Sequence, residues 1–339
     1  MTKLMNKNNQ RAEPVQEQPK LSKEEYAAMK KAEREELWAR LDTLTTDVFK
    51  DAKSLCSFLD FAAQCSPERI ENLLLFHADA PDVTWLKTFD EWKEAGRSVR
   101  SGAVGYTALI GQDYEREDGT MASGYYVGKK FDVSQTRGRQ PDQAPVYAAD
   151  ELVTAFFESS PVRIIVSEEL PEGVQAQYVA KNRAIFVRNN MSAETTFLAI
   201  AREQAAASFD IHDGQYSRNA YTPQSYCATY VAAKKYGLNV SSFSFERVCQ
   251  LCSGLEPQVQ RRFLSDAKQC ALPGFVDSKN EEKTERNAGY LVVSQSGGGM
   301  LRQGTREGIR RTPANRGMRA HRIVKGLDIS EDVCHGMCP

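Results

Sequence analysis

Residues 85–111, WLKTFDEWKEAGRSVRSGAVGYTALIG, join a helix signal, a turn bounded by glycines and a strand signal. Three large rings recur four and three residues apart, which on one helix places them on one face: Trp85, Phe89 and Trp92. Two arginines, Arg97 and Arg100, lie in the turn. A run rich in Val, Tyr, Leu and Ile then predicts a strand over 103–111. The segment predicts a compact helix–turn–strand unit with cations at its rim.

The rings and arginines of this unit fit two interpretations. Aromatic residues at helical spacing most often belong to a hydrophobic core, and the arginines would then form a solvated edge. In a surface that binds nucleic acid, arginines instead contact phosphates and exposed rings stack on bases. The spacing does not decide which rings are exposed, so both interpretations stay open.

A second strand signal follows and predicts a hairpin. Residues 118–119 are Asp-Gly, a dipeptide typical of tight hairpin turns, and 125–133 continue as a return strand. If the strands pair, Tyr126, Lys129 and Lys130 add one ring and two charges beside the arginines. The alternative is an ordinary solvated hairpin.

Length and composition limit the class of protein. A chain of 339 residues suggests two domains, and 41% hydrophobic with 26% charged residues is typical of a globular protein. A formal net charge of -1 excludes a uniformly basic nucleic-acid-binding protein but leaves room for a local basic face. No apolar run is long enough to span a bilayer, and residues 1–20 lack the apolar core of a signal peptide. We therefore expect a cytoplasmic protein without a membrane partner.

Composition shifts along the chain predict its division into parts. The polar segment TRGRQPDQAP at 136–145 is the clearest linker, and the final segment is rich in Arg and Gly. That final segment either binds phosphate backbones without sequence preference or only solubilises the chain. The predicted parts are a disordered stretch at 1–20, a first domain at 21–135, the linker at 136–145, a second domain at 146–275 and a poorly ordered tail at 276–339.

The first domain resembles a known family in the order and spacing of many residues. An Asn is followed by two apolar residues, a Pro, a Phe-x-x-Trp helix and then Gly-Arg-x-Val-x-x-Gly. The matching residues are Asn72, Leu74, Leu75, Pro81, Phe89, Trp92, Gly96, Arg97, Val99 and Gly102. The segment is similar to the N-terminal single-stranded-DNA-binding domain of the ArdC-type antirestriction family of mobile genetic elements. Where that family usually has a Tyr-Ser pair before the Asn, this chain has Glu68 and Arg69.

The resemblance implies a fold and a binding surface. The implied fold is α+β, with a helical and β-hairpin domain that binds single-stranded DNA, followed by a degenerate zincin-like domain. The resemblance and the pattern together assign DNA binding to Asn72, Trp85, Phe89, Trp92, Arg97, Arg100, Tyr126, Lys129 and Lys130. No protein partner is identified.

The second domain resembles a zinc peptidase that has lost its ligands. Such enzymes need two His residues one helical turn apart, a Glu that activates water and a third ligand downstream. Aligned on Glu203, residues 202–206 read Arg-Glu-Gln-Ala-Ala, so both His positions are lost. The downstream acidic ligand is replaced near Ser225 or Tyr226. We therefore expect no catalytic residue, metal or cofactor, and we expect Glu203 to be a surface carboxylate paired with Arg202 or another neighbour.

Two cysteine pairs leave one metal question open. Cys249 and Cys252 have the spacing of half a zinc site, and Cys334, His335 and Cys338 could supply the other half. The first pair lies in a segment that reads as a helix, which favours buried free thiols over a metal site.

These observations predict a non-enzymatic, single-stranded-DNA-binding protein of the antirestriction type from a mobile element. One alternative is a protein-interaction or structural accessory protein that uses the peptidase-like cleft as a binding groove. A lesser alternative is an active zinc metallopeptidase.

Overall fold

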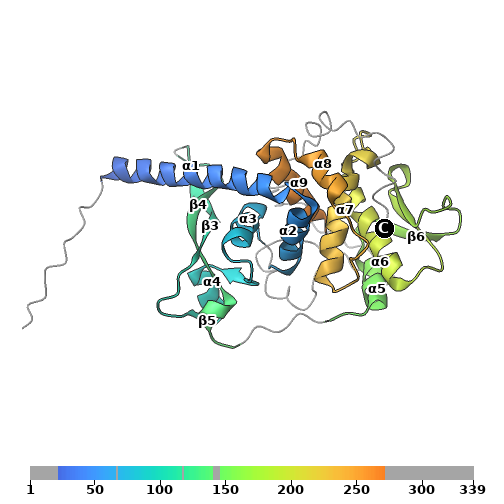
Figure 1. Ribbon diagram of the computed structural model, residues 1–339, viewed down its shortest axis with the longest axis horizontal. Helices are drawn as coiled ribbons and strands as arrows, with labels where there is room; N and C mark the ends of the chain where they lie inside the picture. Colours follow the sequence, from blue (N-terminus) through green and yellow to red (C-terminus); the bar gives the residue numbers. More distant parts are fainter. Residues whose placement is uncertain (1–21, 66–67, 117, 140–145, 272–339) are drawn as a thin grey trace, which may run out of the picture. The chain divides into compact units, whose positions relative to one another are not determined.

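The computed structural model describes residues 22–65, 68–116, 118–139 and 146–271 (Figure 1). The chain divides into two units, Met1–Arg40 and Leu41–Pro339, and helix α1 (Lys23–Val48) runs across their boundary. Ser22 caps α1 as predicted, because its hydroxyl accepts from Glu25 N while the Glu25 carboxylate accepts from Ser22 N. The predicted disordered stretch at 1–20 and the tail at 276–339 lie outside the described residues.

The first half of the second unit combines helices with a long hairpin. Its elements are α2 (Ala52–Gln64), α3 (Ile70–Asp79), β1 (Leu86–Lys87), α4 (Phe89–Glu94), β2 (Ser98–Val99), β3 (Tyr106–Glu115), β4 (Met121–Asp132), the 3-10 turn η1 (Val133–Gln135) and β5 (Thr136–Arg137). Strands β1, β4 and β3 form one antiparallel sheet in that order, and β2 pairs with β5. Tyr106 pairs with Lys130 and Glu115 with Met121, so the predicted hairpin is confirmed.

The predicted helix through the three aromatic rings is wrong. Leu86 and Lys87 pair with β4 as strand β1, and the helix begins only at Phe89. Thr88 and Glu91 form a capping box, in which Thr88 Oγ1 accepts from Glu91 N and the Glu91 carboxylate accepts from Thr88 N. This start signal fixes the helix boundary more strongly than the ring spacing does. Trp85 therefore precedes the helix.

The second half of this unit places helices on a small mixed sheet. Its elements are α5 (Ala149–Ser159), β6 (Arg163–Ser167), β7 (Ala176–Val179), the 3-10 turn η2 (Ala180–Asn182), β8 (Ala184–Arg188), α6 (Ala193–Ala207), α7 (Arg218–Lys235), α8 (Glu246–Cys252) and α9 (Pro257–Cys270). Strand β8 is central, parallel to β6 and antiparallel to β7. A core that includes Phe156 from α5, Ile185 from β8 and Phe197 from α6 joins helices to sheet. The α+β class is thus confirmed.

The two halves of the unit share a direct interface. Helix α7 lies beside α2 (Figure 1), and Tyr230 of α7 donates from its hydroxyl to Asp60 of α2 over 2.6 Å. Lys234 of α7 lies 3.0 Å from the same carboxylate. Helix α9 packs on α3, where Lys268 Nζ donates to the carbonyl of Glu68 over 2.6 Å. The first two residues of the predicted linker form β5, and residues 140–145 are not among those described.

Candidate nucleic-acid interface

Asn72 has a structural role at the edge of the hairpin. Its side chain is buried, and its amide pairs with the backbone of Leu109 in β3, accepting from N over 2.7 Å and donating to O over 3.1 Å. The same amide donates to Glu68 Oε2 over 2.9 Å. An Asn at this position satisfies both backbone groups of a buried strand residue, so it fixes α3 to β3 and lies away from the surface.

Trp92 and Arg97 are buried as well. Trp92 Nε1 donates to the carbonyl of Phe131 over 2.8 Å, which holds α4 against β4. Arg97 Nε donates to Thr136 Oγ1 over 2.8 Å, and its Nη1 bonds the carbonyl of Arg139. Both side chains stabilise the turn between α4 and the paired strands β2 and β5, and neither reaches the surface that a strand of DNA would contact.

Lys130 forms a largely buried ion pair with Glu68. The Glu68 carboxylate thus pairs with Lys130 of the hairpin and accepts a hydrogen bond from Asn72 of α3. Its backbone carbonyl accepts from Lys268 of α9. The charge of Lys130 is neutralised inside the protein. It positions the hairpin and adds little to an external basic surface.

The other predicted site residues lie at or near the surface. Phe89 is 56% exposed and Tyr126 is 46% exposed. Arg100 and Lys129 are exposed, and Lys129 Nζ donates to Thr107 Oγ1 across the hairpin over 2.9 Å. Trp85 is half-buried, with its ring centroid 6.3 Å from that of Trp92. These five residues remain available to a ligand.

The structure adds three residues that the sequence reasoning missed: Arg69, Tyr114 and Tyr125. Each of the two tyrosines is 47% exposed on the hairpin. The guanidinium carbon of Arg69 lies 3.6 Å from the ring centroid of Tyr125, a close cation–π contact. Tyr125 and Tyr126 are consecutive in β4, so their side chains point to opposite faces of the hairpin. This adjacency in the sequence was the available signal that both faces carry rings.

Glycines in the hairpin leave room for the tyrosine rings. A Cβ built on Gly124 would lie 3.0 Å from the ring of Tyr114. A Cβ built on Gly128 would lie 3.0 Å from the ring of Tyr126 and would clash with Ile110. The rings therefore lie against the bare backbone of the strands, as aromatic residues do beside strand glycines. Both rings remain nearly half exposed.

Glu203 is not a surface carboxylate, which corrects the prediction from sequence. It is 0% exposed, and its Oε2 accepts from Tyr178 N over 2.7 Å. Arg218, at the start of α7, donates to both of its carboxylate oxygens, over 2.5 Å from Nη2 to Oε1. Arg202 Nε lies 3.6 Å away, so the predicted pairing is present in a buried form. Helix α6 packs on β7, and this packing turns Glu203 inward.

In the second half of the unit, the described side chains do not fit a metal site. Within the described ranges, no three His, Cys, Asp or Glu side chains come together to hold a metal ion. Tyr226 is buried, and its hydroxyl accepts from Ser244 N over 2.9 Å. Burial raises the pKa of Cys249 to about 11 and that of Cys252 to about 12, which disfavours the thiolates that metals need. Cys334 and Cys338 lie outside the described residues.

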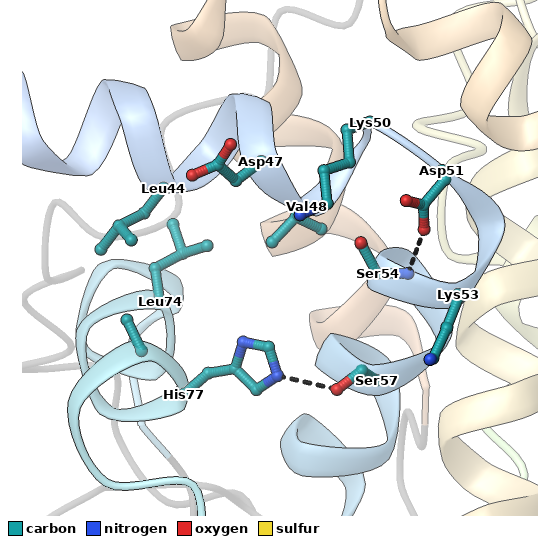
Figure 2. A pocket seen from close by; sticks show the side chains of 11 residues that line it. Leu44, Asp47, Val48, Lys50, Asp51, Lys53, Ser54, Ser57, Leu74 and His77 are labelled. Atoms are coloured by element: carbon teal, nitrogen blue, oxygen red, sulfur yellow. Dashed lines mark hydrogen bonds between the residues drawn. The ribbon is translucent and has the colours of Figure 1, made fainter.

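A pocket of about 440 Å³ lies between the end of α1, α2 and α3 (Figure 2). Asp51 caps α2 by accepting from Ser54 N over 2.7 Å, and Ser57 Oγ lies 3.0 Å from His77 Nε2. Burial lowers the pKa of His77, so its ring is neutral at pH 7. Two lysines and two aspartates line the pocket, and this balance of charge gives it no net attraction for a polyanion.

Comparison with known proteins finds a match over the first part of the chain. Residues 28–149 match the family model described as the N-terminal domain of anti-restriction factor ArdC. This match confirms the predicted resemblance to the ArdC-type antirestriction family.

Solved structures similar to this chain include ArdC from plasmid R388. The metal-free structure is 20% identical, with a TM-score of 0.39, and the Mn(II)-bound structure is 19% identical, with a TM-score of 0.40. Each match covers 61% of this chain and 83% of the other. No curated protein matches the chain. Among the described residues, no helix combines the length and the apolar character needed to cross a membrane.

Proposed function

We propose that the β3–β4 hairpin binds single-stranded DNA and that the protein protects the DNA of a mobile element without enzymatic activity. The observation that carries this proposal is the set of flat tyrosine rings on the hairpin: Tyr114, Tyr125 and Tyr126. Aromatic faces stack on any base, and bases are available for stacking only where the strand is single. The match to the ArdC N-terminal domain supports the same function.

Cations beside the rings fit the phosphate backbone. Arg69 lies over Tyr125, and Lys129 lies on the same hairpin with its ammonium exposed. Arg100 is exposed near the end of β2. The proposed contact residues lie on both faces of the hairpin: Tyr125 and Lys129, with Arg69, on one face, and Tyr114 and Tyr126 on the other. Trp85, Phe89 and Arg100 flank them. The buried residues Asn72, Trp92, Arg97 and Lys130 support them from within.

The contacts of Glu203 support the proposal that the protein has no zinc-peptidase activity. A catalytic carboxylate of a zinc peptidase must accept a proton from metal-bound water. Both oxygens of Glu203 already accept from Arg218, and Tyr178 N occupies one of them further. Activation of water by this carboxylate would require breaking a buried ion pair, so we assign it a structural role.

Fluorescence anisotropy of a labelled single-stranded oligonucleotide tests the binding proposal. The full chain is required, because the first domain shares an interface with α7 and α9. Alanine at Tyr125 or Tyr126 should weaken binding by about 5- to 150-fold, since stacking contributes about 1–3 kcal/mol per base. The matched control is Tyr26→Ala, which removes another exposed tyrosine, on α1, and should leave affinity unchanged.

Salt dependence separates the roles of rings and cations. Lys129→Ala should reduce the slope of log affinity against log salt by about one phosphate contact, whereas Tyr126→Ala should leave the slope unchanged. If the wild-type protein does not bind single strands, or if the hairpin variants bind as tightly as Tyr26→Ala, the proposal is wrong. The accessory-protein alternative is then favoured.

A further inference from the structure

A polar pocket of about 370 Å³ lies where α3 meets α9. The start of α3 contributes Ile70 and Glu71 to its lining. Helix α9 contributes six residues, among them Arg261 and Asp266. The other four are spaced four, three and four residues apart, which places them on one helical face: Gln258, Arg262, Ser265 and Gln269. The volume is within the usual range of pockets that hold small molecules, about 300–1,000 Å³.

The pocket adjoins the tyrosine surface through a chain of direct contacts. Arg69 stacks on Tyr125 of the hairpin, and its Nε lies 3.1 Å from Glu71 Oε2 at the pocket wall. Lys268 of α9 donates to the carbonyl of Glu68, which fixes α9 beside the same end of α3. Arg69 thus connects the ring of Tyr125 to the pocket wall at Glu71.

The chemistry of the pocket suits a nucleobase better than a bare phosphate. Gln258 and Gln269 offer amide groups that both donate and accept, and Arg262 offers a planar fork of donors. These side-chain types form the paired hydrogen bonds by which proteins recognise base edges, Gln with adenine and Arg with guanine. Apart from Arg262, the pocket has no exposed cation, because Arg261 is buried and bonded to Asp42 in the described part of the chain.

The acids of the pocket repel a strand only weakly. Glu71 is paired with Arg69, and Asp266 Oδ2 lies 3.9 Å from Arg262 Nε. Burial raises the pKa of Asp266 to about 6, with Arg262 acting in the opposite direction. A neutral base with donors and acceptors on its edge meets no large electrostatic penalty here.

We infer that this pocket receives one unstacked base of the strand bound on the hairpin and reads its edge through the side chains of α9. The inference rests on the proposed function and adds to it a contribution from the second domain. Stacking on tyrosines tolerates every base, whereas hydrogen bonding in a pocket discriminates between bases. Base preference is therefore the property that belongs to the pocket alone.

The test compares the affinities of the full chain for four oligonucleotides of equal length: oligo-dT, and oligo-dT with one central dA, dC or dG. We expect the wild-type protein to prefer one of them by about 5- to 150-fold, the range of one good paired hydrogen bond to a base. Arg262→Ala, and separately the double variant Gln258→Ala with Gln269→Ala, should reduce this preference to within about twofold. Arg247→Ala is the matched control, because it removes an exposed arginine from α8 and should preserve the preference.

A second readout follows the base itself. Wild-type protein should raise the emission of a 2-aminopurine placed in the oligonucleotide, since that emission increases when the base leaves its stacked neighbours. The double glutamine variant changes only exposed side chains and should lose this rise while still binding.

The outcomes separate the two proposals. If wild-type protein binds no single-stranded DNA, both the proposed function and the pocket inference are wrong. If it binds all four oligonucleotides equally, or if the preference survives in both pocket variants, the pocket inference alone is overturned.

Discussion

Glu203 and Arg218 form an ion pair, and removal of Arg218 should lower the free energy of unfolding more than removal of the Glu203 charge. Glu203 is fully buried, whereas the Arg218 side chain is 37% exposed. Removal of the arginine leaves a buried carboxylate with only Tyr178 N and the more distant Arg202 to compensate it. An uncompensated buried charge costs about 3–5 kcal/mol. Arg218→Ala should lower the free energy of unfolding by about that amount.

Glu203→Gln should lower the free energy of unfolding by less, about 1–2 kcal/mol. The amide keeps the shape of the carboxylate and can still accept from Tyr178 N, while water can reach the partly exposed guanidinium that remains. The double variant should be more stable than the sum of the two single losses predicts, with a coupling energy of about 1–3 kcal/mol.

Urea unfolding followed by circular dichroism measures these differences, provided that the slope against urea stays constant among variants. Lys31→Ala is the control, because it breaks an ion pair with Glu35 in which the two side chains are 71% and 69% exposed. That pair should contribute no more than about 0.5 kcal/mol. Equal losses from Glu203→Gln and Arg218→Ala, or a loss below about 1 kcal/mol for Arg218→Ala, would refute the reasoning.

Two further predictions concern other buried groups. Trp92→Phe should lower the free energy of unfolding by about 1–3 kcal/mol, because it leaves the carbonyl of Phe131 without the indole donor; thermal unfolding measures this, and no loss would contradict a structural role for the ring. Asp266→Asn should stabilise the protein at high pH, because burial raises the pKa of the aspartate from 3.8 to about 6 and its charge is therefore unfavourable above that pH. The gain should reach at most about 3 kcal/mol at pH 8, fall to about half by pH 5 and vanish below both pKa values. A gain independent of pH in urea unfolding would show that the charge is not the cause.

The sequence predicted the elements of the first domain better than it predicted their surface. The Asp-Gly turn and the strand signal over 125–133 predicted the hairpin, since both signals are local. The helix start was misplaced because ring spacing was weighted above the capping box of Thr88 and Glu91. Local chemistry at the helix end, which was also present in the sequence, would have corrected it.

The exposure of the site residues could not be predicted, because it depends on contacts between distant segments. The Asn72 amide donates to the carbonyl of Leu109, 37 residues away, and the Trp92 indole donates to the carbonyl of Phe131, 39 residues away. Glu203 is buried because Arg218, 15 residues later, returns to it from another helix. Each residue type at its position was compatible with a surface role, and only the tertiary partner decides otherwise.

The pair Glu68 and Arg69 shows why a departure from the family pattern can preserve a binding surface. Glu68 joins Lys130 of the hairpin and, through its carbonyl, Lys268 of α9. Arg69 places a cation directly over the ring of Tyr125. One residue thus holds the hairpin against the second half of the unit, and the next supplies both charge and stacking partner at its surface. The residues that replace the usual Tyr-Ser pair therefore link the proposed DNA surface to α9, which lines the proposed base pocket.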